Sequence, residues 1–458
     1  MEVDRRQFIQ SMATADVAST LPAALEIGAD PQPLNILYLH SHDSGRYLEP
    51  YGHPIPTPHL KRLAKQGVLF RQAFSAAPTC SPSRAALLTG SYPHQNGMLG
   101  LAHLGFGLQD YRQHILHTLK PAGYLSILAG TQHIAAKPET IGYDVILRPE
   151  SMRAADVAPA AVHFLKSNPQ QPFFLDVGFF ETHRIYPEPT DQDNPNYVAV
   201  PPQIPDTAAT RRDMAGYHAS ARLLDTGVGL ILDALDQLGL SENTLVISTT
   251  DHGIAFPKMK CTLSDAGCGV SLIMRGPGVF KAGTVQDAMV SHLDIFPTLC
   301  ELVGVEKPDW LMGKSLLPLL HGEVDHLHET LFAEVSYHAA YEPKRCVRTT
   351  RWKYVRRYDG RTTPVLPNCD DGPSKQLWLA HGWQMEPLEH PEELYDLLFD
   401  PAERNNLAAD PAHHDILLNM RSRLETWMHE TNDPLLKGPI PAPPGSKTTP
   451  VNEINPRP

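Results

Sequence analysis

The sequence predicts a layered α/β fold with a mostly parallel central sheet. Three observations support this prediction: short apolar runs that suit buried strands, helical patterns between those runs, and polar residues directly after the runs. The chain has 458 residues, 42% of them hydrophobic, which is enough for one large α/β domain and a smaller one.

The predicted strands are short and continuously apolar. They lie at residues 35–39 (NILYL), 173–177 (FFLDV), 244–248 (TLVIS) and 271–274 (SLIM). Runs of this kind are typical of strands buried on both faces of a parallel sheet. Helical patterns separate them, at residues 59–66, 83–89 and 214–238. Strands that alternate with helices therefore define the large domain, for which we expect residues 34–333.

Polar residues follow three of these strands. His42 and Asp43 follow the first, His183 follows the second, and Asp251 and His252 follow the third. Open α/β sheets bind ligands just beyond the carboxyl ends of their strands. These residues are therefore expected to form one composite site.

The pattern changes from about residue 334. Residues 348–357 (RTTRWKYVRR) and 393–396 (ELYD) predict strands of a smaller antiparallel sheet. Residues 415–429 predict an amphipathic helix, whose apolar stripe consists of Ile416, Leu417, Met420, Leu424 and Trp427. We assign residues 334–432 to this smaller C-terminal domain and 433–458, rich in Pro and polar residues, to an extended tail.

Charge and hydropathy exclude two classes of partner. The formal net charge of −12 argues against general nucleic-acid binding, which needs a basic face, although a local basic cluster can still bind a small anion. No stretch reaches the roughly 18 apolar residues of a membrane-spanning helix. Near the N-terminus, Arg5 and Arg6 precede a small-residue segment that Asp16 and Glu26 interrupt. Two interpretations of residues 1–33 stay open: a degraded twin-arginine signal for export to the periplasm, and the tail of a cytoplasmic protein.

One cysteine stands apart from the other five. No pair has CxxC spacing, so neither a zinc knuckle nor a dense disulfide framework is expected. Cys80, however, begins the run Cys80-Ser81-Pro82-Ser83-Arg84. Proline suits the first turn of a helix, which places Cys80 at a positive helix N-terminus that favours anions. Arg84, about one turn further on, can reach back toward Cys80 or its substrate.

The longer run around Cys80 resembles a family signature. Residues 78–90 (PTCSPSRAALLTG) are similar to the signature of the type I sulfatases, in the alkaline phosphatase superfamily. Residues 94–98 (HQNGM) and 430–434 (ETNDP) most resemble the heparan N-sulfatase, or sulfamidase, branch. The resemblance implies an alkaline-phosphatase-like sandwich. It also implies that a formylglycine-generating enzyme oxidises Cys80 to formylglycine, whose hydrated form can release sulfate by re-forming the aldehyde.

The resemblance also implies a divalent metal site. Calcium is the usual ion of the family, with magnesium and manganese as alternatives. Asp43, Asp251, His252 and the modified Cys80 match the expected ligands, whereas His42 stands where family members commonly carry an aspartate. Because imidazole is a softer donor than carboxylate, His42 weakens the case for an all-oxygen calcium shell and leaves even zinc open.

Three further residues match catalytic positions of the family. His133 matches the histidine that takes up a proton when sulfate is expelled, His183 the histidine beside the leaving-group oxygen, and Lys260 a lysine that binds sulfate. A second sulfate-binding lysine is missing, because Thr131 occupies its position. We hypothesise that Lys137 replaces it.

The leading functional prediction is a sulfuric ester hydrolase acting on a sulfate ester or sulfamate, with a sulfated saccharide as candidate substrate. The alternatives are a phosphonate monoester or phosphodiester hydrolase of the same superfamily, and a catalytically inactive binding protein on this scaffold. Asp294 is interpreted as a helix cap. The basic residues of 348–357 are interpreted either as a solvated face or as a rim that meets an anionic sugar.

Overall fold

The computed structural model describes residues 33–388 and 390–457. The predicted N-terminal tail or export signal, apart from Pro33, lies outside these residues. In the described ranges no helix is long and apolar enough to cross a membrane.

Nine of the described strands form one large sheet, in the order β4-β3-β5-β1-β6-β8-β2-β7, with β9 paired to β2. Their bounds are β1 Asn35–Ser41, β2 Val68–Phe74, β3 Leu125–Gly130, β4 Val145–Leu147, β5 Phe173–Gly178, β6 Thr244–Thr250, β7 Gly269–Val270, β8 Leu272–Arg275 and β9 Thr284–Ser291. The strands from β4 to β6 are parallel, as predicted. The predicted strand at 271–274 is β8, which runs antiparallel to β6 and β2.

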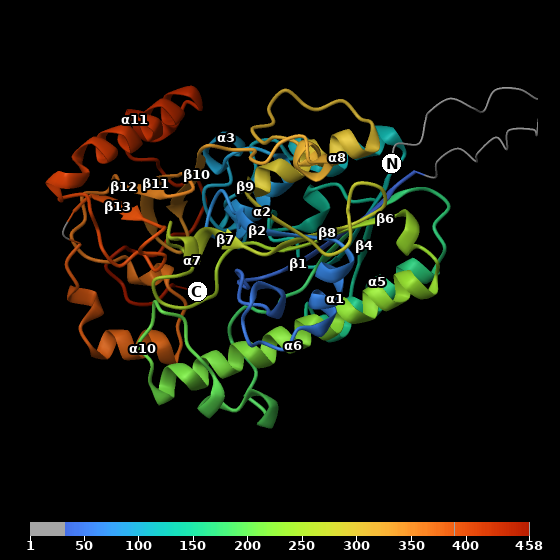
Figure 1. Ribbon diagram of the computed structural model, residues 1–458, viewed down its shortest axis with the longest axis horizontal. Coiled ribbons are helices and arrows are strands. Elements are labelled where there is room, and N and C mark those ends of the chain that lie inside the picture. The colour runs from blue at the N-terminus through green and yellow to red at the C-terminus, as the bar shows by residue number, and fades with distance from the viewer. Residues whose placement is uncertain (1–32, 389, 458) are drawn as a thin grey trace, which may run out of the picture. The chain divides into compact units, whose positions relative to one another are not determined.

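Helices cover both faces of this sheet (Figure 1). On one face lie α1 (Pro58–Gln66), α5 (Ala154–Lys166) and α6 (Ala208–Gln237), and on the other α2 (Cys80–Thr89) and α8 (Ile295–Val303). The shorter helices are α3 Pro93–Asn96, α4 Ile115–Leu119, α7 Asp265–Cys268, α9 Leu317–His321 and α10 Pro373–Ala380.

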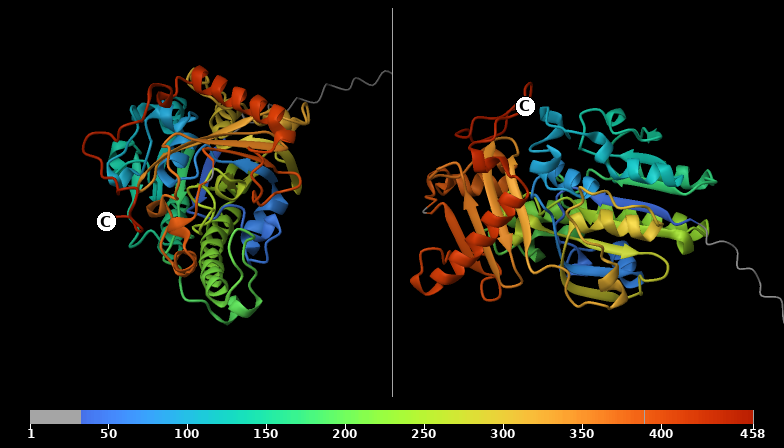
Figure 2. Two further views of the ribbon diagram at one scale, coloured as in Figure 1. Left: turned by 90° about the vertical axis from the view of Figure 1, so that its left-hand side faces the viewer. Right: turned by 90° about the horizontal axis from the view of Figure 1, so that it is seen from above.

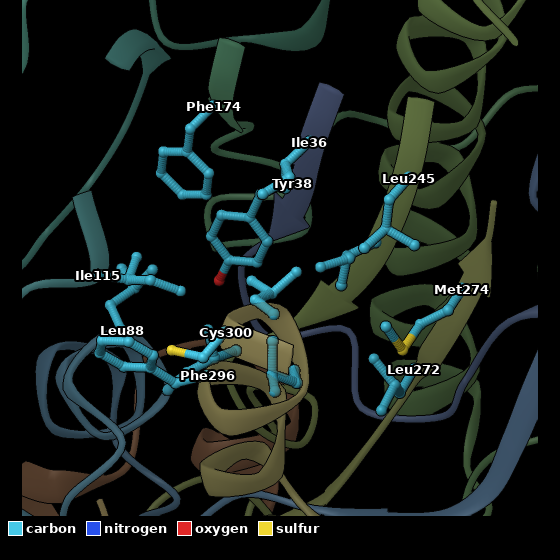
Figure 3. Packing of buried hydrophobic residues seen from close by; sticks show 14 of the residues in the cluster. Ile36, Tyr38, Leu88, Ile115, Phe174, Leu245, Leu272, Met274, Phe296 and Cys300 are labelled. Atoms are coloured by element: carbon cyan, nitrogen blue, oxygen red, sulfur yellow. The ribbon is translucent and has the colours of Figure 1, made fainter. Parts of the chain in front are cut away.

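The two faces of β1 belong to two separate hydrophobic clusters. Leu37 and Leu39 pack with α5 and α6, whereas Ile36 and Tyr38 pack toward α2 and α8. Figure 3 shows Ile36 and Tyr38 with Leu88 and Phe296 in the second cluster. Because successive strand residues point to opposite faces and both faces of β1 are buried, residues 36–39 must all be apolar, which explains the continuous apolar run in the sequence.

The second sheet is antiparallel, in the order β10-β11-β12-β13. Its strands are β10 Leu331–Tyr337, β11 Tyr341–Arg348, β12 Trp352–Arg357 and β13 Glu392–Asp396, and α11 (His414–Glu430) packs against it. Figure 2 shows this sheet and α11 in orange and red. The core side of α11 is formed by Leu417, Met420, Leu424 and Trp427, as predicted, with Ile416 partly buried at its edge. Together the two sheets confirm the predicted fold class.

The basic stretch 348–357 corrects the sequence analysis. It is a hairpin rather than one strand, because β11 ends at Arg348 and β12 begins at Trp352. Its cations form ion pairs within the protein: Arg348 and Lys353 bind Asp265, and Arg351 binds Asp396. Lys353 is only 1% exposed. The stretch is therefore divided: Arg348 and Lys353 are paired inside the protein, Arg351 is partly exposed, and Arg357 lines the large cavity beside the site.

The segment after α11 returns to the rest of the domain. Beyond a short turn at Pro434–Lys437, the backbone N–H of Lys447 donates to Leu104 O and that of Thr449 donates to Ala339 O. In Figure 2 this dark red segment lies beside the cyan region of the chain.

Candidate active site

The ends of β1 and β6 place four of the predicted residues side by side. These strands are parallel neighbours, with Ser41 opposite Thr250. His42 and Asp43 therefore emerge next to Asp251 and His252. The N-terminus of α2 meets them from the adjacent side, with Cys80 as its first residue. The sequence prediction of one composite site at the strand ends corresponds to this arrangement.

Asp43 lies at the centre of the cluster. Its backbone has a φ of 49°, in the left-handed region that few residues other than glycine adopt, and its N–H donates to Asp251 Oδ1 over 2.8 Å. Its carboxylate has Lys260 Nζ 2.9 Å from Oδ2 and His252 Nε2 3.3 Å from Oδ1. The unusual backbone thus aims both carboxylate oxygens into the cluster.

The Cys80 thiol points at the same place. Its Sγ lies 3.3 Å from His252 Nε2 and 3.9 Å from Asp43 Oδ1. Burial raises the pKa of this thiol well above its usual value, and the nearby charges of Lys260 and Arg84 do not offset that effect. The unmodified side chain therefore stays protonated at neutral pH and is a poor nucleophile.

Arg84 holds the neighbouring carboxylate rather than the thiol. Its Nη2 lies 2.9 Å from Asp251 Oδ2 and 2.8 Å from the carbonyl oxygen of Ser41. Its Nη1 contacts His40, which in turn pairs with Asp176 at 2.8 Å. Burial opposes ionisation of Asp251, but His252 and Arg84 outweigh it and hold the pKa of this carboxyl well below its usual range. Arg84 therefore fixes Asp251 as an oriented carboxylate.

Three predicted histidines surround the cluster. His42 Nδ1 lies 3.3 Å from Asp251 Oδ2, and its ring centroid is 5.7 Å from that of His133 and 5.6 Å from that of His183. His183 Nε2 lies 4.0 Å from Asp43 Oδ2. Burial and the charge of Arg84 lower the pKa values of His42 and His133, so both rings are neutral at neutral pH. A neutral imidazole can accept a proton or bind a metal ion.

Lys260 links this cluster to the second sheet region. Its Nζ lies 2.9 Å from Asp43 Oδ2 and 2.8 Å from Asp370 Oδ2. Burial disfavours the ammonium, but Asp370 and Asp43 outweigh it and raise the pKa of Lys260 well above its usual value. Lys260 is therefore a fixed cation at the edge of the site.

Sequence reasoning missed several residues here. Asp370 and His338 lie on connections of the smaller sheet, and His103 Nδ1 lies 3.0 Å from His133 Nε2. Asp370 and His103 follow no strand end and belong to no recognisable motif, and His338 follows β10, a strand that the sequence analysis did not predict, so local sequence gave no signal for them. Lys137 is exposed where η5 (Pro138–Thr140) begins. His103, rather than Lys137, is the basic residue that the structure brings to His133.

The donor set suits a divalent cation. One ligand atom each from His42, Asp43, Cys80 and Asp251 lies within 4.8 Å of all the others. The chemistry of His42 supports this fit, because neither buried ring nitrogen makes a hydrogen bond within the described part of the chain. Buried polar atoms normally find a partner, and a bound cation would supply one. Another group of potential ligands consists of His94, Glu334 and Asp433. Its two carboxylates already pair with the buried guanidinium of Arg345.

A large cavity adjoins Lys260. It has a volume of about 600 Å³, and its lining includes Gln203, Lys258, Asn368, Trp378 and Trp383. The indole rings are 5.8 Å apart, and Lys258 Nζ lies 4.4 Å from the Trp378 ring. Gln203 Oε1 and Trp378 Nε1 are buried without a hydrogen-bond partner in the described ranges. Aromatic faces beside free polar atoms suit an organic ligand with hydroxyl groups.

Comparisons with known proteins identify the family of the chain. The sequence pattern described as Sulfatase matches residues 35–305, and the pattern described as N-sulphoglucosamine sulphohydrolase, C-terminal, matches residues 259–388. The chain belongs to the sulfatase family. The family and enzyme class that residues 78–90 predicted are thus confirmed, together with the closeness to the sulfamidase branch.

Two relatives match this sulfatase over most of its length. N-sulphoglucosamine sulphohydrolase of Homo sapiens is 32% identical, with 89% of this chain and 92% of the relative covered. An ulvan-active sulfatase of Formosa agariphila is 30% identical, with 98% and 90% covered.

Solved structures extend the likeness to the fold. A 2-O GAG sulfatase superimposes with a TM-score of 0.69 at 23% identity, covering 90% of this sulfatase and 95% of that chain. A phosphonate monoester hydrolase of Silicibacter pomeroyi gives a TM-score of 0.64 at 20% identity, covering 87% and 96%.

Proposed function

We propose that this sulfatase hydrolyses a sulfate ester or sulfamate on a saccharide, with a formylglycine made from Cys80 and a bound divalent cation. The observation that supports this most is the position of Cys80 Sγ, 3.3 Å from His252 and 3.9 Å from Asp43 within a metal-ligating group. Nucleophile and cation would therefore meet one sulfate group. The proposal includes a formylglycine-generating enzyme as maturation partner.

Asp43, Asp251, His252, His42 and residue 80 would hold the cation, which when bound neutralises charge on the sulfate. Formylglycine supplies a hydroxyl nucleophile in its hydrated form and a release route through its aldehyde. Arg84 keeps Asp251 ionised and oriented, 2.9 Å from its carboxylate. The buried position of these groups lowers the local dielectric constant and so strengthens their electrostatic effect.

His183 and His133 would carry out the proton transfers of the reaction. His183 is partly exposed at the mouth of the site, and its Nδ1 donates to Arg184 O over 2.6 Å. That bond leaves Nε2 directed at the site, where a protonated ring can donate to the leaving oxygen or nitrogen. His133 is neutral and sits beside His42, so it can accept the proton that the nucleophile loses. Lys260 would bind a sulfate oxygen.

The cavity beside Lys260 would hold the saccharide. Trp378 and Trp383 offer ring faces for sugar C–H groups, and the unpaired polar atoms of Gln203 and Trp378 can bond to hydroxyls. The saccharide class is carried over from the relatives, which include an N-sulphoglucosamine sulphohydrolase and ulvan-active sulfatases.

A peptide mass across Cys80, measured on protein from its native host, tests the modification. We expect the mass of formylglycine; an unconverted thiol would contradict the mechanism. Paired assays with p-nitrophenyl sulfate, an N-sulfated glucosamine and an aryl phosphonate monoester then test the substrate. Turnover of the phosphonate alone would favour the phosphonate hydrolase alternative, and no turnover of any of them by converted protein would favour the inactive scaffold. Cys80→Ala is the control for background hydrolysis.

A further inference from the structure

Two imidazole side chains lie at the proposed cation site. Their presence bears on which ion the site binds. We propose that His42 and His252 make this a mixed imidazole–carboxylate centre that selects a later first-row transition ion, in the range from Fe²⁺ to Zn²⁺, over Ca²⁺ and Mg²⁺. The inference rests on the proposed cation site but not on which substrate is hydrolysed.

His252 is oriented as a metal ligand. Its Nδ1 lies 3.0 Å from the carbonyl oxygen of Gly253, which can only accept, so Nδ1 carries the proton. The lone pair is then on Nε2, which is fully buried and faces Asp43 Oδ1 at 3.3 Å and Asp251 Oδ1 at 3.7 Å. A backbone carbonyl that fixes the tautomer of a ligating histidine is a common feature of metal sites.

These facing atoms repel one another unless a positive charge, either a bound cation or a second proton on His252, lies between them. An imidazole lone pair and a carboxylate oxygen are both acceptors, and neither can donate to the other. His42 lies on the other side of Asp251, with Nδ1 3.3 Å from Oδ2, and because neither ring nitrogen makes a hydrogen bond among the described residues, the unprotonated one is free to bind a cation. His42, Asp43 and Asp251 thus each offer one ligand atom within 4.8 Å of the others, and His252 Nε2 lies against the same two carboxylates.

That donor set distinguishes between classes of ion. Calcium takes six to eight oxygen ligands, and magnesium also prefers oxygen in near-octahedral geometry. Imidazole nitrogen suits Fe²⁺, Ni²⁺, Cu²⁺ and Zn²⁺ better, whereas Mn²⁺ prefers oxygen ligands as Ca²⁺ and Mg²⁺ do. Replacing one carboxylate by His42 also removes one negative charge from the site, which weakens binding of a hard cation further.

The test uses Cys80→Ala protein, so that a thiolate cannot add its own preference for soft ions. The chelator-stripped protein is dialysed against equimolar Ca²⁺, Mg²⁺, Mn²⁺ and Zn²⁺, and the bound metal is measured by mass spectrometry. We expect one equivalent of Zn²⁺, with Ca²⁺, Mg²⁺ and Mn²⁺ each at least tenfold below it. Co²⁺ loading should give visible absorption bands that report nitrogen ligation.

A matched pair of variants assigns the effect to His42. His42→Asp in the same background should shift the preference toward Ca²⁺ by at least tenfold and weaken the Co²⁺ bands. His103→Asp places the same carboxylate on the other, exposed side of His133 and should leave the preference unchanged. His42→Asn, which removes the nitrogen donor without adding charge, covers the case in which the aspartate variant fails to fold.

Preferential Ca²⁺ binding by the parent protein, or equal shifts in the His42→Asp and His103→Asp proteins, would overturn the inference. Binding is measured without turnover, so the outcome is separate from that of the sulfatase assays. Loss of the proposed hydrolysis with an unchanged ion preference would refute the function and leave the ion assignment standing.

Discussion

Two groups of residues in the site differ in how they are built. The strand-end cluster consists of Asp43, Cys80, Arg84, Asp251 and His252, all at most 2% exposed and bonded mainly to one another. The outer cluster consists of Lys258, His338, Asp370 and Trp378, which lie on connections and on α10 around the smaller sheet. In the outer cluster the side chains of Lys258 and Asp370 are 39% and 18% exposed.

The difference indicates a division of roles. Groups held by regular strands and a helix keep one geometry, which reacting atoms require. Groups on connections can vary in sequence without disturbing the sheet, which suits them to substrate selection. We therefore expect changes in the strand-end cluster to reduce kcat and stability, and changes in the outer cluster to act mainly on KM.

Arg84→Ala should give the largest effect. It leaves Asp251 as a buried carboxylate without its guanidinium partner, which typically costs about 3–5 kcal/mol of unfolding free energy. Displacement of Asp251 should also lower kcat by about 10²-fold or more. Denaturant unfolding and steady-state assays measure both.

The control for Arg84 is Arg112→Ala, which breaks an exposed pair with Asp110 and should cost about 0–1 kcal/mol. If the two variants lost equal stability, the strand-end cluster would not be the rigid part of the site.

We expect the next largest effect from His183→Ala. The size of the loss in kcat should depend on the leaving group of the substrate. Loss of a general acid lowers kcat by about 10²–10⁴-fold for a sugar sulfate, whose leaving oxygen needs a proton. The loss should be much smaller for p-nitrophenyl sulfate, because nitrophenolate leaves without one. Equal losses for both substrates would contradict the proposed proton donor.

Acid should destabilise both clusters together. Burial lowers the pKa of His292, below the strand-end cluster, and of His338, in the outer cluster, to about 3 from the usual 6.5. The unfolded chain binds protons at these residues below pH 6.5 and the folded chain does not. The stability that neutral histidines contribute is therefore present above pH 6.5 and is lost as the pH falls toward 3.

Each such histidine lowers the unfolding free energy by up to about 1.4 kcal/mol per pH unit. The unfolding free energy measured from pH 7 to 4 should fall with this slope. In the His338→Gln protein the slope should be smaller by the contribution of one histidine. An unchanged slope in that variant would place the acid sensitivity elsewhere.

Trp378→Ala should have the smallest and most selective effect. Removing an aromatic face from the cavity should raise KM for a saccharide substrate roughly tenfold and leave kcat nearly unchanged. Hydrolysis of p-nitrophenyl sulfate, which is too small to need the cavity, should be unaffected. Met385→Ala, which alters a residue 73% exposed, is the control. A matching KM change for both substrates would remove the distinction between the clusters.

The same division explains what the sequence could predict. Asp43, Asp251 and His252 could be located because each follows an apolar strand, and strand order brings such ends together. Cys80 could be located because a helix start has a local signature. Asp370 and His338 depend on long-range packing of irregular connections, which leaves no periodic pattern.

Charge was the least predictable property. Arg348 and Lys353 formed a basic pattern in the sequence, but their partner Asp265 is more than eighty residues away and enters by way of α7. Arg84 was expected near Cys80 or the substrate, yet its nearest carboxylate is Asp251. Sequence shows which side chains are charged, whereas pairing over long distances in the chain decides which of them remain available.

The segment after α11 holds the connections at the mouth of the site in place. Lys447 bonds to Leu104, beside His103, and Thr449 bonds to Ala339, beside His338. Lys375 Nζ donates to both Ile454 O and Cys369 O, beside Asp370. Residues 447–454, which form no helix or strand, are thus hydrogen-bonded next to His103 and His338. Through Lys375 they are also linked to the residue before Asp370. A cut or a substitution at residues 447–454, far from Cys80 along the sequence, would loosen the mouth of the site while the buried residues of the strand-end cluster stayed in place.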